Sequence, residues 1–380
     1  MKHPVYLDYN ATTQVDEEVV KEMIPYIESF FGNPSSSYQL GRMNNAAIEK
    51  ARVQVAALIK CAPQEIFFTS CATESNNLAI KGIAWANSNK GRHIITTAIE
   101  HPAVTEVCKY LGNHGFVITW LPVDQYGRVN PEDVNKAIRP DTILITIMHA
   151  NNEVGTIQPI GEIGAIARNQ NIYFHTDASQ SVGKIETDVK TLGVDLLTIA
   201  GHKLYAPKGI GALYIRKGTL IDNLMHGAGQ EKGIRPGTEN VMHIVGLGKA
   251  CEIALRDFKK NQQKMEFSRD RLLYGLISRL DDNVHVNGIP GSCLPNTLSV
   301  SFENVSAHAL ASLISRDVLI STGSACHSGE TTISSVLEAM NLDFRTAAST
   351  VRISTGKTTT AEEIDFTTEV LVNAINKLQL

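Results

Sequence analysis

The strongest constraint on the fold of this chain is the regular alternation of short apolar segments with amphipathic ones between residues 60 and 216. The apolar segments are rich in β-branched residues, which is typical of buried strands, and helical patterns lie between several of them. Candidate strands are residues 66–69, 93–97, 117–121, 143–148, 172–176, 196–199 and 212–216, and candidate helices include residues 103–111, 131–138 and 160–169. This alternation predicts an α/β fold with a mostly parallel, seven-stranded sheet covered by helices on both faces.

The pattern changes near residue 257, which predicts a second domain. Residues 256–273 are highly charged and are expected to form a long solvent-facing helix, and the remainder has fewer strand patterns before an amphipathic helix over residues 361–378. A chain of 380 residues with 43% hydrophobic residues is long enough for more than one core. We therefore predict a large α/β domain over residues 15–257 and a smaller α+β domain over residues 258–380.

Composition excludes several classes of function. With 19% charged residues and a net charge of −4, no surface for direct nucleic-acid or membrane binding is predicted. No apolar run reaches the ~18 residues of a membrane span, and the N-terminus has no signal-like segment, so we expect a cytoplasmic protein. The six cysteines are scattered without metal-ligand spacing, so no disulfide framework and no metal site are predicted. All except Cys326 are expected to be small, buried apolar residues.

Lys203 is the most informative single residue. It follows the strand pattern over residues 196–199 and lies among glycines in GHKLYAPKGIG, a poor setting for a solvated surface charge. Burial lowers the pKa of a lysine, and a less protonated amine can form a Schiff base with an aldehyde. The alternative is a lysine in an ordinary strand-to-loop turn, which Lys203 alone does not exclude.

A second polar residue at a strand end, Asp177, favours the chemical role. It lies upstream of Lys203 in HTDASQ and follows the strand pattern over residues 172–176. Ligands of a parallel sheet bind at the carboxyl ends of its strands. A pyridoxal phosphate enzyme needs an aspartate to keep the pyridine nitrogen protonated and a lysine to carry the aldehyde. The two residues together therefore predict a pyridoxal phosphate site.

Further polar residues follow other strand patterns. Ala72 and Thr73 in SCATESNN begin a helix whose free N–H groups suit a phosphate, although an ordinary helix cap is the alternative. His101 in EHPAV is placed to stack on a planar cofactor or to be a plain loop histidine. Asn151 and Asn152 in ANNEVGTIQP are candidates to contact the ring's phenolic oxygen, with a structural turn as the alternative.

The C-terminal half of the chain contributes the remaining candidates. Arg235 and Thr238 lie in the glycine-bounded loop GIRPGTEN. Cys326 lies in STGSACHSG, which is expected to form a flexible, exposed loop where a thiol fills no core and can act as a nucleophile. Arg352 lies in a strand pattern, where it can bind a carboxylate bidentately or form a salt bridge at the rim.

A series of segments along the chain resembles the cysteine desulfurases, pyridoxal phosphate enzymes of the class V aminotransferase family with the fold-type I architecture. These segments are LDYNATT, FGNPSS, SCATESNN, EHPAV, HANNEVGTIQ, HTDASQ, GHKLYAPKGIGALYIR, RPGTEN and STGSAC. The resemblance runs from Tyr6 to about Asp365. It implies a homodimer that converts L-cysteine to L-alanine, takes the sulfur on Cys326 as a persulfide and delivers it to an acceptor protein. It also implies that residues 1–14 pack near the active site.

The resemblance implies a role for each matching residue. Lys203 is the Schiff-base lysine and the expected base, Asp177 is the partner of the pyridine nitrogen, and His101 is the ring-stacking group. Cys326 is the nucleophile. The implied contacts to the phenolic oxygen are Asn152 and Gln180, those to the phosphate are Ala72, Thr73, His202 and the partner subunit's Thr238, and those to the substrate carboxylate are Asn10, Asn152 and Arg352.

The sequence departs from the family pattern at three places. Ala200 stands where many members have a serine that donates to the phosphate, which weakens the phosphate site by about 1.5–3 kcal/mol unless another donor compensates. Tyr38 replaces the histidine of the usual NPSSxH segment. The chain also ends soon after its last helix, so the resemblance does not extend to the longer tail with which housekeeping members engage an iron–sulfur scaffold protein.

Other functions remain open at this point. Selenocysteine lyase, which releases selenium from L-selenocysteine, is the nearest alternative because IAGHK, GQEKGIRPGTEN and ACHSG resemble that relative more closely. AGHKLYAPKG also resembles desulfurases that feed DNA backbone modification, so the destination of the sulfur is open. A non-catalytic scaffold would not need Lys203, Asp177, Cys326 and Arg352 together, and an aminotransferase or kynureninase-like enzyme leaves Cys326 unexplained.

Overall fold

The computed structural model describes residues 4–289, 291–327 and 330–379, and within them all side chains except those of residues 282 and 324–332. Its central sheet has the strand order β2-β8-β7-β6-β5-β3-β4. The strands are β2 (Ile66–Thr69), β3 (His93–Thr97), β4 (Val117–Leu121), β5 (Thr142–Thr146), β6 (Tyr173–Asp177), β7 (Leu196–Ala200) and β8 (Gly211–Ile215). Only β8 runs antiparallel to its neighbours, so the prediction of a mostly parallel seven-stranded sheet is confirmed.

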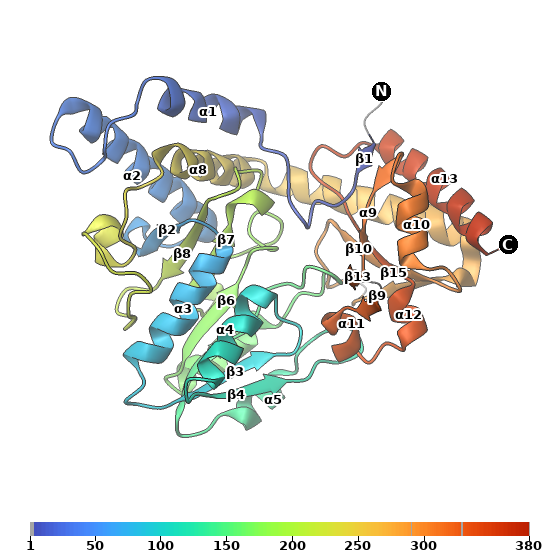
Figure 1. Ribbon diagram of the computed structural model, residues 1–380, viewed down its shortest axis with the longest axis horizontal. Helices are drawn as coiled ribbons and strands as arrows, with labels where there is room; N and C mark the ends of the chain where they lie inside the picture. The colour runs from blue at the N-terminus through green and yellow to red at the C-terminus, as the bar shows by residue number, and fades with distance from the viewer. Residues whose placement is uncertain (1–3, 290, 328–329, 380) are drawn as a thin grey trace.

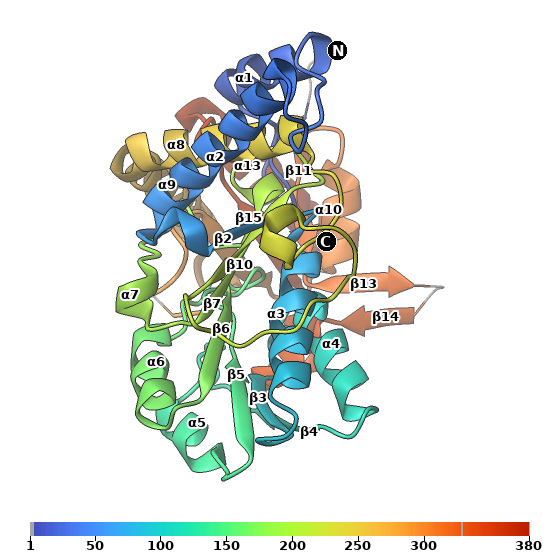
Figure 2. The same cartoon turned by 90° about the vertical axis from the view of Figure 1, so that its left-hand side faces the viewer.

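Helices cover both faces of this sheet, as Figure 2 shows. One face carries α3 (Ala72–Ala86) and α4 (Pro102–Gly112), and their apolar residues share a core with the strands. The other face carries a larger core. The helices on that side are α1 (Glu17–Glu28), α2 (Gln39–Ile59), α5 (Pro131–Ala137), α6 (Ile160–Asn169), α7 (Val189–Leu192) and α8 (Val241–Arg256).

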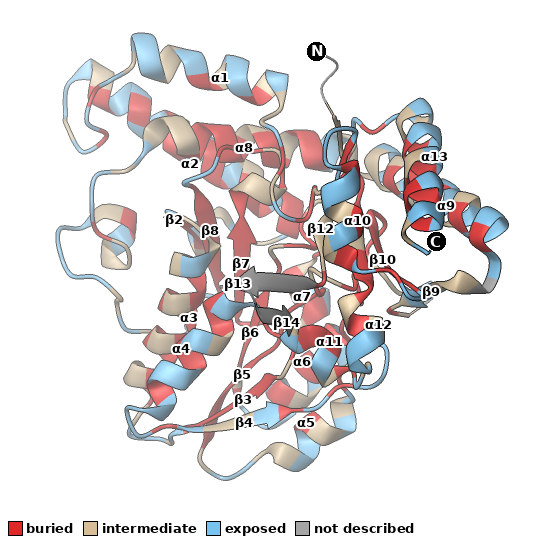
Figure 3. Cartoon of the chain, turned by 45° about the vertical axis from the view of Figure 1, so that its right-hand side comes forward, coloured by how far each residue is buried: buried red, intermediate tan, exposed pale blue. Residues whose placement is uncertain are grey.

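The central strands are buried on both sides, which explains why they read as continuous apolar runs rather than as alternating ones. Every residue of β5, β7 and β8 is buried. In Figure 3 the buried residues concentrate in these strands and on the inward sides of the helices. Polar residues are therefore accommodated mainly where the strands end, and this is where the site lies.

The C-terminal part of the chain has its own sheet (Figure 1) and its own hydrophobic core. The sheet order is β12-β15-β10-β9. Its elements are α9 (Phe258–Leu280), β9 (Val284–Asn287), β10 (Thr297–Phe302), α10 (Ala307–Ile314), β11 (Val318–Leu319), β12 (Ser321–Thr322), α11 (Ser335–Ala339), α12 (Phe344–Ala348), β15 (Thr350–Ser354) and α13 (Ala361–Leu378). Asp257 lies between α8 and α9, at the predicted domain boundary. The division at this residue stays a prediction.

The N-terminal segment runs along this C-terminal part rather than along the central sheet. Strand β1 (Val5–Tyr6) pairs in parallel with β11, and Asp8 forms an isolated bridge with Ser354 of β15. Leu7 is fully buried in the C-terminal core. The segment then turns toward the central sheet, where Thr13 Oγ1 donates to the carbonyl of His202 over 3.0 Å. It thus links the two parts of the molecule beside Lys203.

Three expectations from the sequence need correction. The segment 321–329, expected as a flexible loop, contributes β12 and β13 (Ser324–His327), and β13 pairs with β14 (Glu330–Ile333) in a hairpin that projects from the body in Figure 2. The partner strand lies beyond this segment, so the segment alone gives no signal of the pairing. Helix α9 is not wholly solvent-facing, because Met265, Leu272 and Leu276 are buried.

The cysteines also differ from the expectation. Cys108 and Cys251 are buried, but Cys61, Cys71 and Cys293 are partly exposed. All five are free thiols. Cys61 follows α2, Cys71 precedes α3, and Cys293 lies in the connection between β9 and β10, so none of the three is inside a regular element.

No helix in the described ranges combines the length and the apolar composition that a membrane crossing requires. Among the same residues, no cluster of three or more histidine, cysteine or acidic side chains is arranged to hold a metal ion.

Candidate active site

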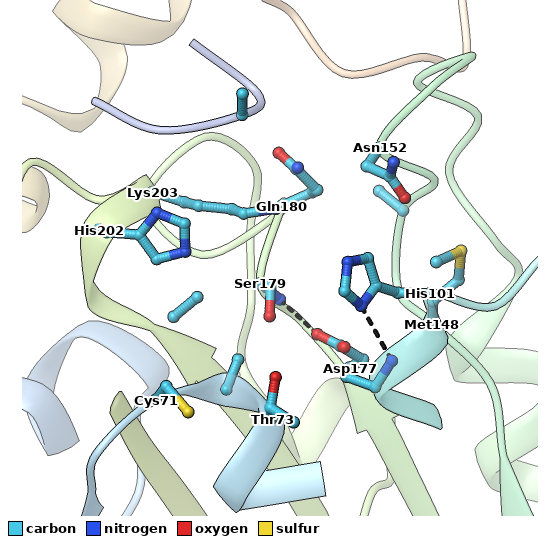
Figure 4. A pocket seen from close by; sticks show the side chains of 15 residues that line it. Cys71, Thr73, His101, Met148, Asn152, Asp177, Ser179, Gln180, His202 and Lys203 are labelled. Carbon is cyan, nitrogen blue, oxygen red and sulfur yellow. Dashed lines mark hydrogen bonds between the residues drawn. The ribbon is translucent and has the colours of Figure 1, made fainter. Parts of the chain in front are cut away.

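A cavity of about 200 Å³ opens at the carboxyl ends of β6 and β7. Figure 4 shows the side chains that line it. This is the edge at which parallel sheets bind their ligands, because the loops that follow the strands converge there. The cavity brings together eight of the residues expected from the sequence: Ala72, Thr73, His101, Asn152, Asp177, Gln180, His202 and Lys203.

Lys203 lies on a short 3₁₀ helix, η2 (Gly201–Lys203), immediately after β7. In the part of the chain that the structure describes, its Nζ has no hydrogen bond or ion pair, and the side chain lines the cavity. Burial, opposed by the nearby Asp177 and aided by Arg352, lowers the pKa of Lys203 to about 8. A large fraction of this amine is therefore neutral near pH 8, the form that attacks an aldehyde.

Asp177 is the last residue of β6 and is held from two sides. Its Oδ2 accepts a hydrogen bond of 2.7 Å from Asn76 Nδ2 of α3, and its Oδ1 accepts one of 2.9 Å from the backbone N–H of Ser179. The side chain is buried, and the two donors fix the orientation of its carboxylate. This arrangement directs a fixed negative charge at the floor of the cavity.

The start of α3 offers donors to an anion. The first N–H groups of a helix have no partner within it, and Cys71, the residue before the helix, makes no side-chain cap. The hydroxyl of Thr73 points up into the cavity in Figure 4. Ser179 Oγ is buried without a partner among the described residues, and the residue lines the same cavity. These unpartnered donors fit a phosphate group.

Histidines lie on two walls of the cavity. His202 Nδ1 is 3.1 Å from Thr12 Oγ1, and burial, Lys203 and Lys208 lower the pKa of His202 to about 4, so its ring is neutral at pH 7. His101 precedes α4, and its Nδ1 accepts a hydrogen bond of 3.1 Å from the N–H of Ala103. The proton of the neutral His101 ring is therefore on Nε2.

The two asparagines after β5, Asn151 and Asn152, have different roles. Asn151 is fully buried, and its side chain bonds to the backbone of Ile99 and of the turn that follows. It belongs to a structural turn. Asn152 lines the cavity, and its backbone oxygen accepts hydrogen bonds from Asn10 and Arg352.

The expected carboxylate ligands are engaged with the protein in this structure. The Asn10 amide donates to Asn152 O and Thr297 Oγ1 and accepts from Lys184 and Asn296, which uses its full hydrogen-bonding capacity. A contact with substrate would have to replace one of these bonds, and the role of Asn10 stays a prediction.

Unlike Asn10, Arg352 retains a hydrogen-bond donor without a partner among the described residues. Its Nη2 is 2.6 Å from Asp8 Oδ1 and its Nη1 is 3.1 Å from Asn152 O, while its buried Nε has no partner among the described residues. An unpaired guanidinium donor suits an incoming carboxylate.

Three expected residues, Asn10, Arg352 and Thr238, are not part of the cavity lining. Thr238 is exposed on the loop before α8. This loop is anchored by Glu231, which is buried in an ion pair of 2.7 Å with Arg52, and by Arg235, whose Nε donates to Glu74 Oε1 over 2.8 Å. The backbone of Cys326 lies in β13 opposite Thr331, and its side chain lies outside the described residues.

Sequence reasoning missed several residues of this site. Ser179 and Asn76 lie within the quoted segments HTDASQ and SCATESNN, so the segments pointed to them although no role was assigned. Cys71 was expected to be an inert core residue but lines the cavity. Lys184 carries no local sequence signal, because its contacts with Gln180 and Asn10 exist only in the folded chain.

Comparison with known proteins places the chain in a family. The Aminotransferase class-V family model matches residues 5–366. The chain is similar to "Cysteine desulfurase IscS" of Dictyoglomus turgidum, at 50% identity over 100% of this chain and 96% of the relative. It is also similar to "Cysteine desulfurase IscS" of Methanosarcina thermophila, at 48% identity over 99% and 93% of the two chains.

Solved structures agree with this assignment. A "NifS-like protein" superposes with a TM-score of 0.92 at 42% identity, covering 98% of this chain and all of that chain. "SspA in complex with cysteine" superposes with a TM-score of 0.83 at 40% identity, covering 93% of this chain and 99% of that chain. The fold, the strand-end cavity and these matches lead to one assignment: the chain belongs to the class-V aminotransferases and, among them, to the cysteine desulfurases.

Proposed function

We propose that this protein is a pyridoxal phosphate-dependent enzyme that converts L-cysteine to L-alanine and takes the released sulfur on Cys326 as a persulfide. The observation that carries the proposal is the cavity in which Lys203 and Asp177 lie at the ends of adjacent strands. A buried amine of lowered pKa beside a fixed carboxylate has no evident structural purpose, since the two form no ion pair with each other among the described residues.

The residues present fit pyridoxal phosphate. Lys203 Nζ would bind its aldehyde, Asp177 its pyridine nitrogen, and the start of α3 with Thr73, Ser179 and His202 its phosphate. Ala200 lines the cavity without a hydroxyl, and the unpartnered Ser179 Oγ is a donor that would compensate for it. When bound, the cofactor supplies an electron-accepting ring that stabilises negative charge at the substrate's α-carbon.

Residues of the chain would bind and orient the substrate and the cofactor ring and would transfer the α-proton. Arg352 would bind the substrate carboxylate and orient the α-carbon toward Lys203, whose Nζ would take the α-proton. Asn152 and Gln180 would donate hydrogen bonds to the ring's phenolic oxygen. His101 would cover the ring and keep its proton on Nε2, since Nδ1 is occupied by the N–H of Ala103.

Sulfur transfer would follow at Cys326. Its thiolate would attack the sulfur of the substrate, so that a new S–S bond forms while the substrate's Cβ–S bond breaks. The electron pair of the broken bond stays with the carbon fragment, which takes up protons and leaves as alanine. The persulfide would then pass its outer sulfur to a thiol of an acceptor protein.

A homodimer is part of the proposal, because Thr238 is exposed and lies outside the cavity of its own chain. In a dimer, the partner subunit's Thr238 would complete the phosphate site. A cytoplasmic location is also part of the proposal, since free thiols stay reduced there.

The test is to measure alanine release from L-cysteine by the protein loaded with pyridoxal phosphate, with L-selenocysteine as the competing substrate. We expect turnover of L-cysteine that is lost in Cys326→Ala together with the persulfide on the protein. Turnover of L-selenocysteine with negligible turnover of L-cysteine would instead identify a selenocysteine lyase.

A further inference from the structure

Lys184 is a buried lysine that the proposed reaction does not use. It is 5% exposed and lines a small cavity of about 20 Å³ that shares Lys203 with the active-site cavity. Lysines are seldom buried without a carboxylate partner, because removing the ammonium group from water is costly. Within the described ranges, Lys184 forms no ion pair. Its placement therefore calls for another explanation.

Among the residues that the structure describes, Lys184 Nζ hydrogen-bonds only with amide oxygens. It donates to Gln180 Oε1 over 3.0 Å and to Asn10 Oδ1 over 3.3 Å. Burial, together with repulsion from Lys203 and Arg352, lowers the pKa of Lys184 to about 7. In both protonation states the amine retains at least two N–H groups, which matches these two oxygens. The contacts therefore persist across the neutral pH range.

These contacts determine how the Gln180 amide is oriented. The two ends of a carboxamide have nearly the same shape, so hydrogen-bond partners decide which end faces which way. Because Lys184 Nζ donates hydrogen bonds to this amide, the oxygen of the carboxamide, Gln180 Oε1, faces Lys184. Gln180 Nε2 then donates to the backbone oxygen of Asn10 over 2.9 Å. The second N–H of Nε2 remains for the cavity that Gln180 lines.

The same amine also holds Asn10 in place. Asn10 Oδ1 accepts from Lys184 and from Asn296 Nδ2, and Asn10 Nδ2 donates to Thr297 Oγ1 over 2.8 Å. Asn296 and Thr297 belong to the C-terminal part of the chain, whereas Lys184 and Gln180 follow β6 of the central sheet. Lys184 thus fixes a polar junction between the two parts directly beside Lys203.

We infer that Lys184 is a positioning residue, which orients the Gln180 carboxamide so that its N–H faces the cofactor's ring oxygen and which anchors Asn10 beside the active-site cavity. The inference rests on the proposed function, because the ring oxygen belongs to pyridoxal phosphate. It makes a specific claim: Lys184 affects cofactor binding through Gln180 and not by general stabilisation of the fold.

A double-mutant cycle tests this claim. Lys184→Met removes the N–H donors at similar side-chain length, and Gln180→Leu removes the amide on which they act. The readouts are the dissociation constant for pyridoxal phosphate and the position of its visible absorbance band on each protein. Melting of the apoproteins checks that the variants are folded. Lys190→Met is the matched control, because Lys190 is exposed on α7.

In the wild-type background, we expect Lys184→Met to weaken binding of pyridoxal phosphate about tenfold and to shift its visible absorbance band. A tenfold loss corresponds to the loss of one hydrogen bond to a charged oxygen, here the ring oxygen of the cofactor. In the Gln180→Leu background the same change should alter affinity less than about twofold. The Lys190→Met control should match wild type.

Equal losses in both backgrounds, or wild-type affinity and an unchanged band in Lys184→Met, would overturn the inference. If Lys184→Met does not fold, the same cycle with Lys184→Gln decides by the same criterion. A wild-type protein that takes up no pyridoxal phosphate would instead contradict the proposed function.

Discussion

Lys203 has the properties that a lysine needs to react with an aldehyde near neutral pH. It is attached to the rigid end of β7, and its Nζ has no partner among the described residues. Burial holds its pKa at about 8, far below the usual value near 10.4. Since only the neutral amine is nucleophilic, this shift increases the reactive fraction at pH 7 by more than a factor of 100.

The first prediction concerns the pH dependence of cofactor uptake. Below pH 8 most Lys203 is protonated, so the rate of reaction of the apoprotein with pyridoxal phosphate should rise with pH and level off above about 8. Stopped-flow absorbance measures this rate, with a free lysine derivative as reference, whose rate keeps rising toward pH 10. A protein rate that also climbs through pH 10 would contradict the lowered pKa, and Lys203→Ala should form no band.

The second prediction concerns the charge of Asp177. Asp177→Asn keeps the shape and the bond to the Ser179 N–H but removes the negative charge at the cavity floor. We expect the variant to bind pyridoxal phosphate and to lose about 10- to 100-fold in kcat, as for a hydrogen bond to a charged group worth about 1.5–3 kcal/mol. Alanine release measures the effect. An unchanged kcat would show that this charge does not act on the cofactor.

At the scale of elements, the N-terminus of α3 explains how the phosphate of the cofactor could bind in the same cavity as the Asp177 carboxylate. The helix dipole and the unpaired N–H groups at Ala72 and Thr73 favour negative charge, while Asp177 faces another side of the cavity. Arg235 neutralises Glu74 in the first turn of the same helix, so that this carboxylate does not oppose the bound anion. Glu74 also accepts a hydrogen bond from the N–H of Ser70, which shapes the turn before the helix.

The third prediction tests this helix start directly. Thr73→Val removes a hydroxyl that points into the cavity, so binding of pyridoxal phosphate should weaken about tenfold. Binding of pyridoxal, which lacks the phosphate, should change less than about twofold. Absorbance titrations of the apoprotein with each compound measure the two constants. An equal loss for both compounds would mean that Thr73 supports the ring or the fold rather than the phosphate.

Local sequence patterns predicted most elements because buried strands form apolar runs and amphipathic helices repeat their apolar residues with a helical period. The bounds of β2, β3, β4, α6 and α13 agree with those expected. The hairpin of β13 and β14 was missed, since small residues such as those of GSAC carry little strand preference and pairing depends on a second strand. Register between strands that are distant in sequence has no local signal.

In the site too, features with a local sequence signal were predictable and features that depend on long-range packing were not. Residues that follow strands, such as Asp177 and Lys203, were predictable because strand ends converge at one edge of the sheet. Lys184 and Asn76 were not, because Lys184 meets Asn10 and Asn76 meets Asp177 only when distant segments pack together. For Cys326, the proposed role still depends on the sequence alone.

At the scale of the whole molecule, three segments meet around one cavity. The central sheet contributes Lys203 and Asp177 to the lining, whereas Asn10 of the N-terminal segment and Arg352 of the C-terminal part bond to the backbone oxygen of Asn152, which lines it. Asp8 pairs with Arg352 across this junction over 2.6 Å. A relative movement of the two parts would therefore change the substrate side of the cavity while the cofactor side stays with the central sheet.

The fourth prediction addresses the proposed dimer. If the partner subunit's Thr238 completes the phosphate site, Thr238→Val should weaken cofactor binding in the homodimer. Mixed dimers of Thr238→Val with Lys203→Ala should regain one site of wild-type affinity, because the intact Thr238 would face the intact Lys203. Cofactor titration of purified mixed dimers measures this recovery. No recovery, or a monomer by light scattering with full activity, would contradict the shared site.

The central claim is that the amine of Lys203, and no other, bonds to the aldehyde of pyridoxal phosphate. Borohydride reduction of the loaded protein, followed by peptide mass spectrometry, tests it directly because the reduced bond survives digestion. We predict one modified lysine per chain, Lys203, and no label on the neighbouring Lys184, whose pKa is also lowered. A label on Lys184 or on surface lysines, or no label at all, would contradict the account.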